Sequence, residues 1–555
     1  MTDREHYEAV VVGAGPGGAA AAARLADHGV ETLVLERGVE AGSKNVSGGL
    51  IYAENSAPYR IDDLFPDFRE EATERPITDY QMDNIAGNAV KTYDLTPLHE
   101  NDTKWCDAVL RRKMDSWLAE RVHEKCREHG GGLLTDVRVN GLLREDGEII
   151  GVTCDELDDI EADVVIGADG VNSELARAAG LMDWEDPEEW FQGVKAVVDM
   201  PDGAIQERFD VGEGEGAARL FSGDLFQDVR GGGFMYTNQD TLSIGTVFHL
   251  DSLAAERAEP HELLNALLTH PHLSEWIGDE YEELEYSAKL VPDSKKVALK
   301  EPHRDRLLLV GDAAGQMQAQ GPIIKGMNHA VTAGALAADA YVTSRGRSDK
   351  TAGQRYASLL KEEGVMAKLR PSSYEVTSSV TESSAVAGVT ETLASSFLGR
   401  AVLRTGVGES LVSRAFNSPT MLSMLPDIRP AYVTIPTLLA EEQGVPVEGE
   451  SSVEPPSLED RIGDLTYDTD IGNPHIRLRD NSYAASGTAV TACPVSAEDF
   501  GGGCYRSETV KTNGGEERVV SLDTQPCVEC GTCAIVADTE WEHPRGGKGV
   551  EYRQG

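Results

Sequence analysis

The chain has 555 residues and carries 95 acidic against 50 basic side chains, which gives a formal net charge of −45. Its length predicts more than one domain, because single hydrophobic cores rarely grow beyond about 250–300 residues. Its acidity excludes nucleic acid as a partner, since binding to phosphates requires a basic face. A hydrophobic fraction of 40% still supplies folded cores.

The N-terminus predicts a cytoplasmic protein. A strand begins at residue 9, and no charged and apolar signal segment precedes it. No run of about 18 uncharged apolar residues occurs, so we expect no transmembrane helix, while attachment to a membrane surface stays open. The acidic residues are spread along the chain, which is typical of salt-loving organisms, whose high salt screens like-charge repulsion.

The first motif occupies residues 7–38 and predicts a dinucleotide-binding unit. A strand at 10–12 is followed by glycines with G-x-G-x-x-G spacing, an alanine-rich helix to about His28 and a second strand at 32–35. The glycines are Gly13, Gly15 and Gly18. They allow a tight turn, close approach of a pyrophosphate and close packing of helix on strand. Glu36 ends the second strand, where it is placed to accept a hydrogen bond from a ribose hydroxyl.

Three later segments carry the same kind of signal. Residues 37–52 form a glycine-containing loop, residues 162–173 an apolar strand that ends in acid and glycine, and residues 306–340 a strand, a Gly-Asp pair and a long helix of small residues. The residues singled out are Arg37, Ser47, Gly48, Gly49, Asp169, Gly170, Gly311, Asp312, Gly326 and Met327. Each acid alone also suits a helix cap, but their joint order favours a cofactor site.

These elements, in this order, resemble the flavoprotein superfamily built like p-hydroxybenzoate hydroxylase, which implies an α/β fold and bound FAD. The resemblance implies that Asp312 contacts the ribityl chain and that the helix starting near Gly326 points its N-terminus at the flavin ring. It also implies that Arg111 or Arg112, in the segment 109–122, lies near the cofactor. No second G-x-G-x-x-G unit for a nicotinamide cofactor is evident.

On this resemblance the FAD-binding domain is discontinuous and takes residues 1–184 and 301–350. Between these ranges, residues 185–300 predict an inserted sheet-rich domain, which in the superfamily covers the flavin ring and forms the substrate or quinone pocket. Within the insertion, apolar and polar residues alternate around an Asn-Gln-Asp turn, which predicts a hairpin at 231–252.

The rest of the chain divides into three parts. Residues 351–440 have a helical pattern, broken by an apolar, proline-containing stretch at 417–440 that either contacts quinone or membrane or packs between domains. Residues 441–464 are rich in Pro, Glu, Ser and Gly and predict a linker. Residues 465–555 are therefore expected to form a separate small domain.

The small domain holds a candidate iron-sulfur site. Cys527, Cys530 and Cys533 form a C-x2-C-x2-C run, which suits a [4Fe-4S] cluster but lacks a fourth ligand. Cys493 is followed by proline, as is the remote ligand in ferredoxins, and we favour it over the competing Cys504. Four thiolates also bind zinc, although zinc ribbons prefer two separated C-x-x-C pairs.

The chain resembles the electron-transfer flavoprotein:quinone oxidoreductase family, as a FixC-type flavoprotein fused to a FixX-type ferredoxin-like domain. The stretches that carry the resemblance are SKNVSGGLIY, GGGFMYTNQDTLSIG, EYSAKLVPDSKK, VGDAAG, EWEHPRGGKGVEYRQG and the cysteine run. The family implies transfer of electrons from reduced electron-transfer flavoprotein, with FAD and one [4Fe-4S] cluster, to a membrane quinone such as ubiquinone or menaquinone. It also implies a peripheral position on the inner face of the cell membrane.

Two segments depart from the family pattern. The spacing between Cys493 and Cys527 is longer than usual, and QMQAQGPIIKGM replaces the usual residues after VGDAAG. These departures bear on the cluster ligand and on the quinone pocket. Two other functions stay open: a bifurcating Fix-type complex that delivers electrons to ferredoxin, and an FAD lipid reductase resembling geranylgeranyl reductase. The ferredoxin-like domain argues against the lipid reductase.

Overall fold

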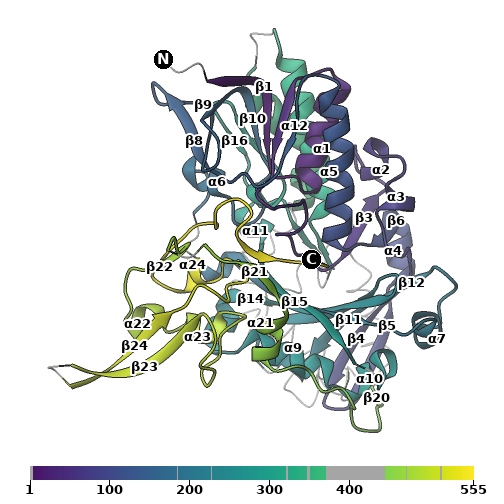
Figure 1. Ribbon diagram of the computed structural model, residues 1–555. Coiled ribbons are helices and arrows are strands. Elements are labelled where there is room, and N and C mark those ends of the chain that lie inside the picture. Colours follow the sequence, from purple (N-terminus) through teal and green to yellow (C-terminus); the bar gives the residue numbers. More distant parts are fainter. Residues whose placement is uncertain are drawn as a thin grey trace, which may run out of the picture.

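The computed structural model describes residues 4–183, 186–226, 228–279, 281–320, 323–346, 350–369, 440, 444–470, 472–512 and 515–555. Within these residues two eight-stranded sheets organise the chain, one in the upper and one in the lower half of Figure 1. The C-terminal segment, yellow in the same view, runs between them. The fold therefore brings three parts of the chain to one place.

The upper sheet is mainly parallel and contains the predicted dinucleotide-binding unit. Its strand order is β16-β17-β10-β1-β2-β7, and β9 and β8 extend it from β10. The bounds are β1 Glu5–Val12, β2 Thr32–Leu35, β7 Gly132–Leu134, β8 Val139–Glu145, β9 Glu148–Cys154, β10 Ile160–Gly167, β16 His303–Arg304 and β17 Leu307–Leu309. The central strands are mostly apolar and buried, as expected of a parallel sheet that is covered on both faces.

Three long helices pack beside the upper sheet: α1 (Pro16–Asp27), α5 (Arg111–Arg127) and α12 (Met327–Ser344). Helices α1 and α12 approach closely, because a Cβ on Gly334 would lie 2.1 Å from the carbonyl oxygen of Gly17. The small residues of both helices therefore serve close packing. As a result the first turns of α1 and α12 lie at the same edge of the sheet, where both line one cavity.

The lower sheet is mainly antiparallel, with the order β15-β11-β14-β13-β12-β4-β5-β20. The bounds are β4 Ile77–Ala86, β5 Ala89–Asp94, β11 Trp190–Asp199, β12 Gly216–Gly223, β13 Gly231–Thr237, β14 Thr241–His249, β15 Glu283–Pro292 and β20 Val445–Pro446. Strands β13 and β14 pair antiparallel across the turn at 238–240, which confirms the hairpin predicted at 231–252.

The lower sheet draws strands from outside the predicted insertion at 185–300. Strand β4 pairs in parallel with β12, and β5 continues from β4 as a hairpin. Tyr80, Met82 and Ile85 of β4 are buried, so apolar burial favours this placement. The predicted boundary at residue 184 therefore does not separate the two sheets.

Shorter elements connect the two sheets and cover their edges. They are β3 Leu50–Glu54, α2 Ile61–Leu64, α3 Phe68–Glu71, α4 Thr96–Asp102, β6 Thr103–Ala108, α6 Glu174–Ala178, η1 Pro187–Glu189, α7 Ala204–Phe209, η2 Asp224–Phe226, α8 Leu250–Ala255, α9 Pro260–Leu268, α10 Pro271–Ile277, α11 Ser294–Val297, η3 Gly311–Ala314, β18 Gln318–Gln320 and β19 Ile323–Lys325. Among the helices that the structure describes, none combines the length and apolar character needed to cross a membrane.

The predicted helical region at 351–440 is described only at its two ends. It begins with α13 (Ala352–Glu362) and α14 (Val365–Leu369). Helix α13 starts with a capping box, in which the Thr351 hydroxyl accepts a hydrogen bond from the backbone N–H of Gln354. The apolar stretch predicted at 417–440 lies outside the described residues, except for its last position.

The predicted linker at 441–464 is anchored to the lower sheet where the structure describes it. Its first strand, β20, pairs with β5, and it ends in helix α21 (Leu458–Asp464). Arg461 of this helix forms a buried bidentate ion pair with Glu283 of β15, at 2.8 and 2.9 Å. The segment therefore packs along the molecule instead of leaving it as a free tether.

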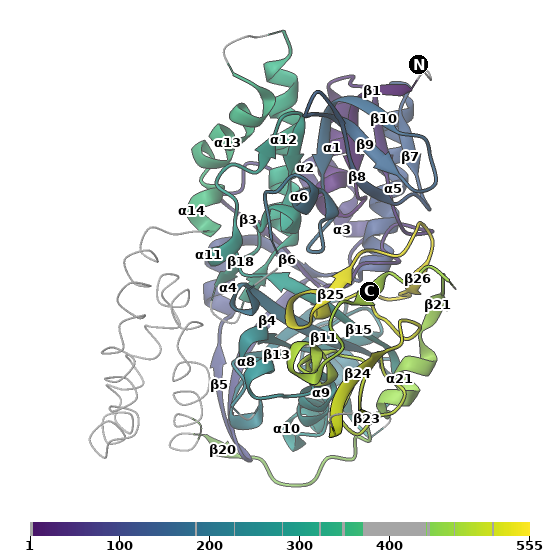
Figure 2. The ribbon, with the colours of Figure 1, turned by 90° about the vertical axis from the view of Figure 1, so that its left-hand side faces the viewer.

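Residues 465–555 form short strand pairs around the clustered cysteines, beside the lower sheet (Figure 2). The bounds are β21 Thr466–Asp468, β22 Ile476–Leu478, α22 Tyr483–Ser486, α23 Ala489–Ala492, β23 Tyr505–Thr512, β24 Gly515–Leu522, α24 Cys533–Val536, β25 Thr539–Trp541 and β26 Gly549–Glu551. The last stretch also reaches the upper half, because the ammonium of Lys44 donates to the carbonyls of Lys548 and Val550 at 2.8 and 2.7 Å. The C-terminal region therefore packs against both halves of the molecule.

Candidate functional site

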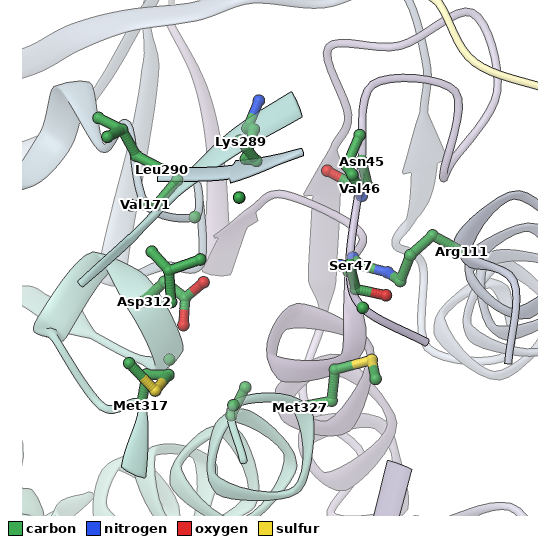
Figure 3. Close-up of a pocket in the computed structure, with 18 of the residues that line it drawn as sticks. Asn45, Val46, Ser47, Arg111, Val171, Lys289, Leu290, Asp312, Met317 and Met327 are labelled. Carbon is green, nitrogen blue, oxygen red and sulfur yellow. The ribbon is translucent and has the colours of Figure 1, made fainter. Parts of the chain in front are cut away.

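A cavity of about 360 Å³ lies where the upper sheet faces the lower sheet (Figure 3). The ends of β1, β2 and β10 open into it, which is the edge where α/β sheets bind their ligands. Every cofactor-binding residue predicted from the sequence except Gly18 lines this cavity: Gly13, Gly15, Glu36, Arg37, Ser47, Gly48, Gly49, Arg111, Asp169, Gly170, Gly311, Asp312, Gly326 and Met327.

The glycine turn after β1 adopts a shape that larger residues do not allow. Gly13 has a φ of 98°, and a Cβ there would lie 2.4 Å from the carbonyl oxygen of Ala168. Gly18 faces away from the cavity onto the turn itself, where a Cβ would lie 1.9 Å from the Gly13 carbonyl oxygen. The turn therefore holds the N-terminus of α1, with its positive dipole end, at the cavity wall.

Glu36 already holds the glycine turn through hydrogen bonds of its own. Its carboxylate accepts from the backbone N–H groups of Ala14, at 3.0 Å, and Gly38, at 2.8 Å. The side chain is 6% exposed and lines the cavity. A carboxylate with further acceptor capacity at this position is suited to a ribose hydroxyl.

The loop at 44–49 and the start of α5 form one wall of the cavity, on the right of Figure 3, across from Asp312 and Met317. The Ser47 hydroxyl is buried and has no hydrogen-bond partner among the described residues, as expected of a group that awaits a ligand. Arg111 lines the cavity and is held by Asp115 at 2.6 Å, whereas Arg112 forms an ion pair with Glu40. Of the two predicted arginines, Arg111 is therefore the one placed to reach a cofactor.

The two predicted acids differ in what they contact. Asp169 accepts hydrogen bonds from the Ser173 hydroxyl at 2.7 Å and from the Leu175 N–H at 3.1 Å, so it does cap helix α6 while lining the cavity. Burial raises its pKa to about 6, against the opposing effect of these hydrogen bonds. Burial also raises the pKa of Asp312, whose carboxylate lies 3.7 Å from where a Cβ on Gly326 would stand.

The lower sheet contributes cavity residues that the sequence patterns did not single out. Lys195, Phe234, His249 and Lys289 extend from strands β11, β13, β14 and β15. Lys195 is 2% exposed, and burial lowers its pKa to about 8. A lone lysine inside an otherwise apolar strand is the signal that identifies such a residue, because a buried ammonium is costly unless it serves a partner.

All five cysteines of the C-terminal region are buried and have free thiols. The neighbouring thiols of Cys493 and Cys527 raise the pKa of the Cys504 thiol well above its usual value, so both predicted fourth ligands lie near the cysteine run. Within the described part of the chain, no three His, Cys, Asp or Glu side chains gather closely enough to hold a single metal ion.

The loop of residues 527–533, here called the cysteine loop, lies against the cavity wall. The Asn172 side-chain amide donates to the carbonyls of Glu529 and Cys530 at 3.3 and 3.2 Å. The backbone N–H of Leu290 also donates to Cys530, at 3.3 Å, and the Lys289 ammonium donates to Glu529, at 3.1 Å. Asn172, Lys289 and Leu290 all line the cavity, so one layer of residues separates it from the cysteine loop.

Several known proteins resemble this chain. A family model for an FAD binding domain matches residues 6–358. Protein FixC of Escherichia coli O157:H7 is 38% identical over 353 residues, which cover 63% of this chain and 80% of that protein. The probable electron transfer flavoprotein-quinone oxidoreductase YdiS of Escherichia coli K12 is 34% identical over 375 residues, covering 66% and 83%.

A solved structure shows the same fold. The crystal structure of a geranylgeranyl bacteriochlorophyll reductase-like protein from Thermoplasma acidophilum matches with a TM-score of 0.52 and 18% identity, covering 80% of this chain and 97% of that one. Together with the family model it confirms the predicted α/β FAD-binding fold of the p-hydroxybenzoate hydroxylase type.

The raised pKa of Asp169 predicts a pH-dependent stability. A carboxyl group whose pKa rises from 3.8 to about 6 on folding contributes stability below about pH 4, and this contribution is lost as the pH rises to about 6. We expect the free energy of unfolding of the wild type minus that of Asp169→Asn to fall over this range. Urea unfolding of the cofactor-free protein at several pH values measures it, and a pH-independent difference would contradict the raised pKa.

Proposed function

Because the chain belongs to the FixC family of FAD-binding flavoproteins, we propose that it passes electrons from reduced electron-transfer flavoprotein to a membrane quinone. The chain is an FAD-dependent oxidoreductase of electron transfer. The observation that carries the finer proposal is the cysteine loop, which is hydrogen-bonded to residues of the cavity wall. Two electron carriers separated by a single layer of side chains would form a continuous route.

The residues around the cavity fit FAD. The N-terminus of α1 would face the pyrophosphate, Glu36 would accept from a ribose hydroxyl, and the free Ser47 hydroxyl would find a partner on the cofactor. Asp312 in η3, together with the nearby Gly326 at the start of α12, would hold the ribityl chain and the flavin ring. Bound flavin would supply transfer of electrons singly or in pairs, while the protein supplies position and electrostatics.

The C-x2-C-x2-C run and the two further cysteines support the proposal of an iron-sulfur cluster in a ferredoxin-like domain at 465–555. We assign Cys493, Cys527, Cys530 and Cys533 as the ligands of one [4Fe-4S] cluster, with Cys504 as the alternative to Cys493. All five thiols are buried and free of disulfides, as cluster ligands would be. The cluster would exchange single electrons, so its pairing with a flavin suits conversion between one-electron and two-electron partners.

The quinone would approach from the lower sheet. Phe191, Phe234 and His249 line the cavity there, on the side away from the glycine turn. Aromatic rings beside an imidazole and the ammonium groups of Lys195 and Lys289 suit an aromatic head group that needs hydrogen bonds. A quinone acceptor places the protein peripherally on the inner face of the cell membrane, and the high acidity suits a salt-rich cytoplasm.

The proposed function predicts that the protein accepts electrons from electron-transfer flavoprotein and then gives them to a quinone. Protein purified in high salt, with flavin and cluster spectra recorded, is first reduced by electron-transfer flavoprotein and then mixed with a short-chain quinone. We expect the quinone to reoxidise the flavin. The control is Gly13→Ala, which should not hold FAD because its Cβ would clash with Ala168.

The same reduced protein is then mixed with a prenyl lipid or with ferredoxin in place of the quinone, and two outcomes would overturn the proposal. Reoxidation by a prenyl lipid but not by quinone would identify a lipid reductase. Reoxidation by ferredoxin in place of quinone would identify a member of a bifurcating complex. Either result would keep the FAD site and change the acceptor.

The cluster assignment predicts different losses from the two competing cysteines. We expect Cys493→Ser to lose iron and sulfide while it retains FAD, and Cys504→Ser to keep both cofactors, because only a ligand is indispensable to the cluster. Iron, sulfide and flavin content per chain measure the result. Cys154→Ser, at a thiol outside the cysteine group, is the control. The reverse pattern would assign Cys504 as the fourth ligand.

A further inference from the structure

Glu529 is a buried charge in the middle of the cysteine loop. It lies between Cys527 and Cys530 and is 1% exposed. Its backbone φ is 53°, in the left-handed region that non-glycine residues rarely adopt. A buried carboxylate in a disfavoured backbone conformation is costly, so its neighbours must compensate for it.

The neighbours of Glu529 come from the opposite domain and from the end of the chain. One carboxylate oxygen, Oε2, lies 2.8 Å from Nη1 of Arg37, and the other, Oε1, accepts from the Val550 N–H at 3.0 Å. The Lys289 ammonium donates to the Glu529 carbonyl at 3.1 Å, and the Lys44 ammonium donates at 2.7 Å to the carbonyl of Val550, whose own N–H binds Glu529. Glu529 therefore lies among cations that come from the end of β2, from the loop at 44–49 and from β15 of the lower sheet.

Arg37 connects this charge to the cavity. It directly follows Glu36 at the end of β2, and its own side chain lines the cavity. Its carbonyl accepts a hydrogen bond from the Gly547 N–H at 2.9 Å. One arginine therefore contacts the cavity, the cysteine loop and the C-terminal stretch at once.

We propose that Glu529 is a positioning residue that couples FAD binding in the cavity to the geometry of the cysteine loop through Arg37. This inference rests on the FAD and cluster sites proposed above. If the loop fixes Arg37 in the form that binds FAD, bound FAD must in turn stabilise the loop, because coupling between two sites is reciprocal. Glu529 itself does not line the cavity, so it acts through Arg37.

The test is the affinity of the flavin-free, full-length protein for FAD, measured by titration calorimetry. We expect Glu529→Gln to weaken FAD binding about tenfold, a magnitude typical of coupling between sites. The direction of the change in FAD affinity distinguishes the two possible effects of the substitution. Removing a negative charge near an anionic cofactor would by itself tighten binding, so weaker binding reports the loss of positioning.

Asp107→Asn is the matched control. Asp107 is also 1% exposed and is held by an arginine, Arg69, at 2.8 and 2.9 Å, but neither residue lines the cavity or belongs to the cysteine loop. We expect this variant to lose stability and to bind FAD like the wild type. The comparison separates lost positioning from the general cost of a broken buried ion pair.

A double-mutant cycle that combines Glu529→Gln with Arg37→Met then isolates the contribution of the contact between these two residues to FAD affinity. In the Arg37→Met protein, adding Glu529→Gln should cause no further loss of FAD affinity, because Glu529 no longer has Arg37 to act through. Should Glu529→Gln fail to fold, Arg37→Met alone still tests the coupling. Bound FAD should slow hydrogen exchange at residues 527–533 in the wild type and lose this effect in Arg37→Met.

Unchanged or tighter FAD binding by Glu529→Gln, or additive effects of the two substitutions, would overturn the inference. These outcomes differ from failure of the proposed function. A wild type that binds no FAD would refute the assignment of the cavity, and a wild type without iron would refute the cluster. The FAD titration reports the coupling whether or not the cysteines hold a cluster.

Discussion

The contact between the cysteine loop and the wall of the cavity is the constraint on which the rest of the structure depends. Two backbone carbonyls of the loop, at Glu529 and Cys530, accept hydrogen bonds from Asn172, whose other neighbours belong to the FAD-binding fold. Gly531 must be glycine there, because a Cβ would lie 2.4 Å from the Asn172 side-chain oxygen. A small displacement of this contact would move the cysteine loop away from the cavity wall.

Close packing brings the partners of this contact to the same edge. The glycines of α1 and α12 let the two helices start side by side, and the lower sheet closes the cavity from the other side. The C-terminal stretch then crosses both halves, where Glu285 accepts hydrogen bonds from the backbone N–H groups of residues 553–555. The small domain is thus held by the same elements that form the cavity.

Sequence patterns predicted the parts of the site whose residues lie close together along the chain. The unit at 7–38 contains strand, turn and helix within one short segment, so its spacing alone indicates its geometry. Strand β4 joins the lower sheet through pairing with β12, more than a hundred residues away, and no local pattern reveals such a partner. Lys195 and Lys289 were missed for the same reason, since their role depends on which strands meet at the cavity.

The most direct test of the account is a crystal structure of the anaerobically purified protein, with iron located by its anomalous scattering. The account predicts one iron cluster bounded by Cys493, Cys527, Cys530 and Cys533, and FAD in the cavity on the other side of Asn172. A cluster with Cys504 in place of Cys493 as its fourth ligand would change one residue of the account and leave the rest intact. A cysteine loop without iron, or FAD bound away from this cavity, would contradict it.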